Sequence, residues 1–349
     1  MTNPYETLPP TAFWRSAVAE SGPFNLSGLF APKFPVSRDM AVATAGSCFA
    51  QHVGRALRGA GLAVLDAEPA PPGLDPDSAR RFGFGLYSGR YGNIYTTRQL
   101  LHLLQDAAHP RTRPEAIWTR DGRFYDALRP GTEPEGLESA DELRQLRAFH
   151  LSRLSAMLRQ CALFVFTLGM TEAWVDAATG TVFPSAPGIL ADPPTSAQVV
   201  FHNFRFAEVL ADLTAAFDLL RGFNPQMRLL LSVSPVPLTA TATQHHVLAA
   251  TMASKAILRA VVDDFSRDRP EVDYVPSYEI ITNPAAKGRF FAANLRSVTQ
   301  EGVDLVMAQF LQAHGLAPLP VAPETTTATP PDEADALICE EALVEAFRP

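Results

Sequence analysis

Cysteine is scarce in this sequence. Cys48, Cys161 and Cys339 are the only three among 349 residues, and no two of them form a CxxC pair. This argues against a disulfide framework and against a zinc site built on thiolates. No His, Asp or Glu pair has the short spacing of metal ligands either, so we predict neither a metal nor a cofactor. Such cysteine usage fits a reducing compartment, and we predict a cytoplasmic protein.

Three further features are missing from the chain. It has no Lys- and Arg-rich run of the kind that contacts phosphates, and its formal net charge is −8, which argues against nucleic acid as a partner. Residues 1–16 lack the basic start and continuous apolar stretch of a signal peptide. No later run reaches the ~18–20 apolar residues that a membrane span requires. The sequence therefore predicts neither export nor membrane insertion.

The composition is that of a folded globular protein, with 47% apolar and 19% charged residues. The first 36 residues are rich in Pro and aromatics without a clear period, and we expect an irregular segment there that packs over the domain. The regular pattern occupies residues 37–316. Residues 317–349 read as a Pro/Thr-rich linker and an acidic C-terminal tail outside the fold.

Short apolar runs alternate with helical patterns along residues 37–316. The expected strands are residues 40–45, 62–65, 161–168, 229–233 and 272–275. The expected helices are residues 48–60, 96–104, 143–158, 204–220, 246–265 and 298–311. Ser139 and Glu142 form a capping-box signature that predicts the start of the third of these. A hairpin is expected around Asp121-Gly122, and a long loop at 69–92. This alternation predicts an α/β fold, a three-layer α/β/α sandwich with a central, mostly parallel sheet.

The first expected strand ends in the sequence Gly46-Ser47-Cys48, where a helix is expected to begin. In parallel sheets ligands bind beyond the carboxyl ends of the strands. A hydroxyl at such a turn lies near free backbone N–H groups that stabilise an oxyanion, so Ser47 is the candidate nucleophile. Two alternatives remain: Ser47 is only a helix cap, or the Cys48 thiol is the nucleophile.

The sequence around Ser47 resembles that of the GSCFA-domain family, which is related to the SGNH/GDSL hydrolases. The signature Thr-Ala-Gly-Ser-Cys-Phe-Ala occupies residues 44–50. Four further stretches follow in the family's order: Tyr-Gly-Asn-Ile-Tyr-Thr at 91–96, Thr-Leu-Gly-Met-Thr-Glu-Ala-Trp at 167–174, Ser-Pro-Val at 234–236 and Pro-Ser-Tyr-Glu at 276–279. Together they extend over roughly residues 38–312.

The resemblance implies an SGNH-type sandwich in which Ser47 takes the place of the serine in the hydrolases' Gly-Asp-Ser block. Gly92 is similar to the second-block glycine, whose backbone N–H points into the oxyanion hole together with that of the serine. Asn93 beside it would supply a side-chain donor. The alternative is an ordinary turn in a glycine-rich loop.

Two departures from the hydrolase pattern bear on catalysis. Residues 169–172 read Gly-Met-Thr-Glu where the hydrolases carry Gly-x-Asn-Asp, so Thr171 would donate in place of the Asn and Glu172 can only accept. The expected Asp-x-x-His block reads Ala-Ala-Asn-Leu-Arg-Ser at 292–297, without the acid and without the histidine.

A serine needs a base, and the sequence has eight histidines to supply one. His246 is the preferred candidate because it falls in the first turn of a helix, capped by Thr243, after the strand that ends at Val233. Its alternative is a surface histidine. His52, directed away from the turn, and His202, at a helix start, are weaker choices. Glu279 or Glu172 would orient the base.

These observations predict an esterase or O-acyltransferase that acts on a small or carbohydrate-linked acyl ester through a serine nucleophile. The second hypothesis is a catalytically inactive ligand-binding protein on the same scaffold, because two catalytic blocks are absent. The predicted partner is a small-molecule or carbohydrate substrate. The oligomeric state and the substrate itself are not readable from the sequence.

Overall fold

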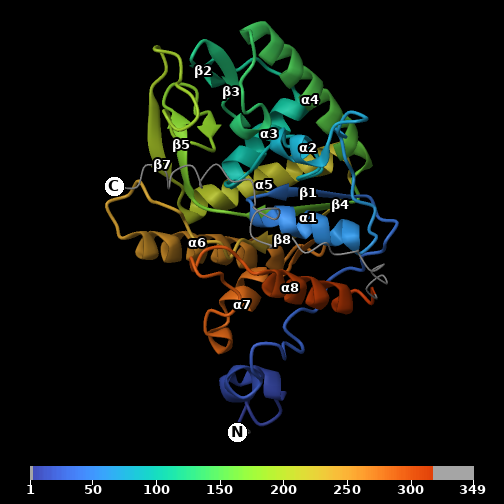
Figure 1. The fold of residues 1–349 in the computed structure, drawn as a ribbon. Coiled ribbons are helices and arrows are strands. Elements are labelled where there is room, and N and C mark those ends of the chain that lie inside the picture. The colour runs from blue at the N-terminus through green and yellow to red at the C-terminus, as the bar shows by residue number, and fades with distance from the viewer. Residues whose placement is uncertain (1–2, 317–349) are drawn as a thin grey trace.

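A computed structural model describes residues 3–316, and its centre is a parallel four-stranded sheet (Figure 1). The strands follow in the order β1 (Val42–Gly46), β4 (Leu163–Leu168), β8 (Arg228–Val233) and β9 (Val272–Tyr274). Every residue of β1 and β4 is buried, as expected for a sheet covered on both faces. The predicted parallel sheet is confirmed.

Helices cover both faces of this sheet, which confirms the three-layer arrangement (Figure 1). One core cluster joins the sheet to α3 (Thr97–Ala108), α4 (Ala140–Gln160), α5 (Phe206–Phe223) and α6 (Val247–Arg267). The other joins it to α1 (Phe49–Gly59), α7 (Ser277–Thr282) and α8 (Gln300–Ala313). Side chains alternate between the two clusters along β4: Phe164 and Phe166 belong to the first, Leu163 and Val165 to the second.

Side-chain caps explain where several helices begin. Ser139 accepts a hydrogen bond from the Glu142 N–H at 3.1 Å, so the start predicted for α4 is confirmed. The prediction for α6 was wrong in one detail. The N-cap is His246 rather than Thr243, because the His246 ring accepts from the Leu248 N–H while the Thr243 hydroxyl bonds Thr241.

The strands that lie outside the central sheet were predicted only in part. The hairpin of β2 (Ile117–Arg120) and β3 (Arg123–Asp126) forms as expected, with Asp121 and Gly122 at positive φ. A second, antiparallel sheet was missed; it consists of β5 (Glu172–Asp176), β6 (Val182–Phe183) and β7 (Val199–Asn203). Its strands are short and sit in irregular sequence, so no period marks them.

The strand expected at 62–65 was wrong. Its Val64 forms only an isolated parallel bridge to Val42, and the chain then leaves the sheet. The expected loop at 69–92 contains the short helix α2 (Pro76–Arg81), which Asp75 caps.

The N-terminal segment has two short helical turns, Pro10–Ala12 and Arg15–Ala19. Phe24 anchors it edge-on to Phe290, at 5.8 Å between ring centroids. The division of the chain at residue 36 stays a prediction, and the predicted linker and tail at 317–349 lie outside the described residues. Within residues 3–316 no helix has the length and apolarity to cross a bilayer, and no three His, Cys, Asp or Glu side chains are grouped to hold a metal ion.

Candidate functional site

The turn after β1 places Ser47 against the neighbouring strand β4. Gly46 has a φ of 142°, and a β-carbon there would lie 2.4 Å from the Thr167 carbonyl oxygen, so glycine is required. The Ser47 N–H donates to that same oxygen at 3.2 Å. The parallel ladder thus continues one residue beyond β1. This hydrogen bond engages the Ser47 N–H, which had been predicted to donate to the oxyanion instead.

The Ser47 side chain is buried, with 3% of the residue exposed. Its Oγ forms no hydrogen bond with any atom of the described chain. The cap alternative is not realised, because the N-cap of α1 is Cys48 and Ser47 Oγ accepts nothing. A buried hydroxyl without a partner costs about 1–3 kcal/mol, and such a group in a native structure calls for an explanation.

Gly169, just beyond β4, packs on the other side of Ser47. A β-carbon at Gly169 would lie 2.9 Å from Ser47 Cβ and 3.1 Å from the Tyr95 carbonyl oxygen. The N–H groups of Gly169 and Met170 donate to that Tyr95 oxygen at 2.9 and 3.1 Å. The Gly169 carbonyl accepts from Lys255 Nζ of α6 at 2.5 Å. Gly169, next to the candidate nucleophile, is therefore hydrogen-bonded through both its N–H and its carbonyl oxygen.

Lys255 was missed by the sequence analysis, although the sequence carries a signal for it. The residue is 2% exposed and lies three and seven positions before Leu258 and Val262, which are core residues of α6. It therefore belongs to the apolar stripe of the helix. A lysine inside such a stripe is unusual, because burying its ammonium group is costly.

Asn93 lies behind the Ser47 turn, and its predicted role as an oxyanion donor stays a prediction. Its Oδ1 accepts from the Tyr87 hydroxyl at 2.5 Å and from Gln51 Nε2 at 3.3 Å. The same Tyr87 hydroxyl is 3.1 Å from the Ser47 carbonyl oxygen. Gly92, next to Asn93, adopts a φ of 68°, which suits a glycine. The structure thus brings Gly92, Asn93 and Ser47 into one buried region.

Thr171 and Glu172 are committed to partners on other elements. The Thr171 hydroxyl donates to Asn203 Oδ1 of β7 at 2.7 Å, and its N–H donates to Ser254 Oγ of α6 at 3.0 Å. Glu172 accepts from the Thr241 hydroxyl at 2.7 Å. These contacts fasten the second sheet to the loop before α6.

A cleft of about 230 Å³ lies beside the contact between Glu172 and Thr241. Trp174 and Phe201 contribute aromatic side chains to its wall, with their ring centroids 5.8 Å apart. Met170 and Glu172 also line it, so the cleft begins one residue beyond Gly169. It combines apolar rings with a carboxylate, the mixture found in small-molecule sites.

The other predicted catalytic residues have partners away from Ser47. His246 Nδ1 accepts from the Leu248 N–H at 3.1 Å. Glu279 accepts from Arg259 Nε at 2.5 Å and from the Tyr274 hydroxyl at 2.6 Å. Among the hydrogen bonds of the described residues none joins Ser47, His246 and Glu279, so a triad of these three stays a prediction.

The two weaker histidine candidates are placed as follows. His202 lies in β7, not at a helix start, and its Nε2 is 2.9 Å from Glu208 Oε1. His52 is buried on α1 and packs edge-on to Phe49, with the ring centroids 5.9 Å apart.

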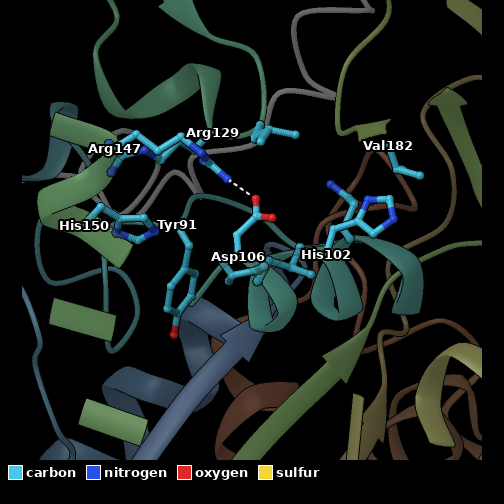
Figure 2. A pocket seen from close by; sticks show the side chains of 11 residues that line it. Tyr91, His102, Asp106, Arg129, Arg147, His150 and Val182 are labelled. Carbon is cyan, nitrogen blue, oxygen red and sulfur yellow. Dashed lines mark hydrogen bonds and ion pairs between the residues drawn. The ribbon is translucent and has the colours of Figure 1, made fainter. Parts of the chain in front are cut away.

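A second buried polar cluster lies between α3, α4 and the β2–β3 hairpin, and Figure 2 shows its side chains around a cavity of about 30 Å³. Asp106 accepts from Arg113 and Arg147 at 2.8 Å each. His150 Nδ1 lies 2.7 Å from Glu68 Oε2. Because the cavity has room for about one or two waters, it is too small for a substrate, and the cluster reads as a structural ion network.

Burial and neighbouring charges shift the pKa values of His150 and Glu68. Burial, aided by the charge of Arg129, lowers the pKa of His150 to about 4. For Glu68 burial works in the opposite direction, but the hydrogen bond from His150 and the charge of Arg129 outweigh it and lower the pKa to about 2. At neutral pH a neutral imidazole therefore donates to a carboxylate, and His150 Nε2 is left without a partner in the described chain.

The chain was compared with protein families, curated proteins and solved structures. The sequence profile of the GSCFA family matches residues 41–310. No curated protein matches the chain. Among solved structures, the chain is similar to the crystal structure of a carbohydrate esterase family 3 protein from Talaromyces cellulolyticus, with 10% identity and a TM-score of 0.34. That match covers 78% of this chain and 94% of the other.

Proposed function

We propose, from the premise that this chain belongs to the GSCFA family, that it is a serine-dependent ester hydrolase or acyltransferase related to the SGNH hydrolases. The observation that carries the proposal is the Ser47 hydroxyl. It lies at the carboxyl edge of the parallel sheet and has no hydrogen-bond partner in the described structure. Buried hydroxyls are usually hydrogen-bonded, so an unbonded hydroxyl at this edge of the sheet supports a role in binding or chemistry.

In the proposed reaction Ser47 Oγ attacks the carbonyl carbon of an acyl ester and forms an acyl-enzyme. The N-terminus of α1 lies just beyond Ser47, with Cys48 as its N-cap, so the helix dipole supports the negative charge that develops on the oxygen. Gly92 and Asn93 are the further proposed donors.

The proposed substrate is a small or carbohydrate-linked acyl ester. Support comes from the cleft that begins at Met170, whose walls offer the rings of Trp174 and Phe201 and the carboxylate of Glu172. The described cysteines Cys48 and Cys161 are buried and form no disulfide, consistent with the proposed cytoplasmic location.

A catalytically inactive binding protein is the second candidate function. It is favoured by the missing Asp-x-x-His block and by the partners of His246 and Glu279, which lie away from Ser47. In that case the cleft would bind its ligand without turnover.

Covalent labelling with a fluorophosphonate probe separates the two. The native protein is expected to gain one phosphonyl group on the peptide that contains Ser47, and Ser47→Ala is expected to gain none. Ser277→Ala is the matched control, since Ser277 is a buried serine whose hydroxyl donates to the Val233 carbonyl. Equal labelling of native protein and Ser47→Ala would remove Ser47 as the nucleophile, and an unlabelled native protein would favour the binding function.

A further inference from the structure

The second sheet carries a carboxylate and two aromatic rings on one face. Side chains two positions apart along a strand point to the same side, so Glu172 and Trp174 of β5 share a face and lie about 7 Å apart along the strand. Phe201 of the neighbouring strand β7 is the direct cross-strand partner of Trp174 and lies on that face too (Figure 1). The three side chains therefore form one compact group.

This group lines the cleft of about 230 Å³ that begins at Met170. The contacts of Glu172 place its carboxylate on the cleft wall. It accepts from the Thr241 hydroxyl at 2.7 Å and from the Ala242 N–H at 3.3 Å, and Thr241 and Ala242 line the cleft as well. The planes of the two rings meet at 64°, so the rings form two adjoining walls rather than one flat surface.

The charge of this cleft is negative. Glu172 is the one charged residue among the described residues that line it, and neither Lys, Arg nor His is present there. Only 8% of Glu172 is exposed, and its partners within residues 3–316 are both neutral donors. Burying a carboxylate without a cation is costly. A positively charged ligand would offset that cost.

Fastening the sheet to the loop before α6 does not require this charge. A glutamine at position 172 would accept from the Thr241 hydroxyl and would cost less to bury than a carboxylate. The remaining wall is mainly apolar, with Pro184, Ala186 and Ile189, so it offers few acceptors for the N–H groups of a primary ammonium. Aromatic faces, in contrast, attract quaternary ammonium groups through the ring quadrupole.

We propose that this cleft binds an organic cation, a quaternary ammonium group held between the Glu172 carboxylate and the rings of Trp174 and Phe201. Binding of the cation does not depend on chemistry at Ser47. The further assignment, that the cation is part of the small acyl ester that the protein turns over, rests on the function proposed above.

Three probes test the site by isothermal titration calorimetry. Choline carries a quaternary ammonium group. Its neutral carbon analogue has a tert-butyl group in the same place, and ethanolamine carries a primary ammonium group. We expect choline to bind the native protein about tenfold or more tightly than either, since a desolvated cation over aromatic rings gains that much.

Variants of the three side chains locate the binding. Glu172→Gln is expected to weaken choline binding about tenfold or more and to leave binding of the neutral analogue unchanged. Trp174→Leu and Phe201→Leu are each expected to weaken choline binding several-fold. Trp14→Leu is the matched control, because Trp14 is 68% exposed on the N-terminal segment, and it should bind choline like the native protein.

Thermal melting verifies that each variant is folded. Where Glu172→Gln fails to fold, the two ring variants carry the test, since neither side chain forms the contacts to Thr241 and Ala242. Ser47→Ala should bind choline with native affinity. Loss of fluorophosphonate labelling would therefore remove the proposed function and leave the cation site standing, and absence of choline binding would leave the labelling of Ser47 unaffected.

Four results would overturn the inference. Equal affinity for choline and its neutral analogue would show that the positive charge is not recognised, and tighter binding of ethanolamine would show that the cleft prefers N–H groups. Native choline affinity in folded Glu172→Gln would show that the carboxylate only fastens the loop. Native affinity in both Trp174→Leu and Phe201→Leu would show that choline binds elsewhere.

Discussion

Gly169 and Ser47 lie back to back at the carboxyl edge of the sheet, each at the end of a neighbouring strand. A β-carbon on Gly169 would come within 2.9 Å of Ser47 Cβ, closer than real side chains approach each other. Glycine at 169 is therefore a steric condition for the position of Ser47. The candidate site therefore depends on the absence of a side chain at residue 169 as well as on the side chains around Ser47.

Gly169→Ala is expected to displace either Ser47 or the Tyr95 peptide, because both lie within 3.1 Å of the new β-carbon. Overpacking of this kind costs about 1–3 kcal/mol of folding stability, which urea unfolding measures. We also expect the fluorophosphonate labelling rate to fall. Gly222→Ala on α5 is the matched control: nothing lies within 4 Å of its β-carbon, and alanine in a helix should raise stability by about 0.5–1 kcal/mol. Equal stability of the two variants would contradict the packing argument.

His246→Ala separates the two roles that can be given to this histidine. As a cap of α6 its loss should cost about 0.5–1 kcal/mol of stability and leave labelling of Ser47 within about twofold of the native rate. As a base its loss should slow labelling about 100-fold or more. We expect the first result, since His246 Nδ1 is bonded to the Leu248 N–H. Labelling kinetics and thermal melting on the same sample decide the matter.

His150 should make the protein sensitive to mild acid. The unfolded chain binds a proton on His150 near pH 6.5, whereas the folded chain binds it near pH 4 because burial opposes the charge. Between these values the unfolded state holds more protons, so stability falls as the pH falls, by about 3 kcal/mol for this residue. His150→Gln should flatten the fall between pH 6.5 and 4 in urea titrations. An unchanged pH dependence would show that His150 is not the residue responsible.

Asp106→Asn is expected to be strongly destabilising. Asp106 is fully buried and accepts from Arg113 and Arg147, which would both be left as buried cations with a weaker partner. Breaking a buried ion pair costs about 3–5 kcal/mol. Glu301→Gln is the matched surface control, because the Arg289–Glu301 pair is half-exposed, and its urea midpoint should stay unchanged. Comparable midpoints for the two variants would show that the buried network contributes little.

Local signals in the sequence predicted much of the fold. The apolar runs that became β1, β4 and β8 were readable because strands buried on both faces have no polar positions to interrupt them. The start of α4 was readable from Ser139, since a cap depends on residues only three positions apart. The β5–β7 pairing was not readable, because it depends on contacts between residues that are distant in the chain, such as Glu172 with Asn203.

The sequence alone also identified the candidate nucleophile: a short apolar run ends at Gly46, a residue that permits a sharp turn, and this predicted that Ser47 lies at the carboxyl edge of a strand. What surrounds Ser47 was decided by the tertiary structure. Gly169 and Lys255 are 122 and 208 residues away along the chain, and only the pairing of β4 with β1 and the packing of α6 bring them to the turn. The spacing of residues in a sequence indicates which of them are neighbours within one helix or strand. An active site, in contrast, contains residues from several helices, strands and loops.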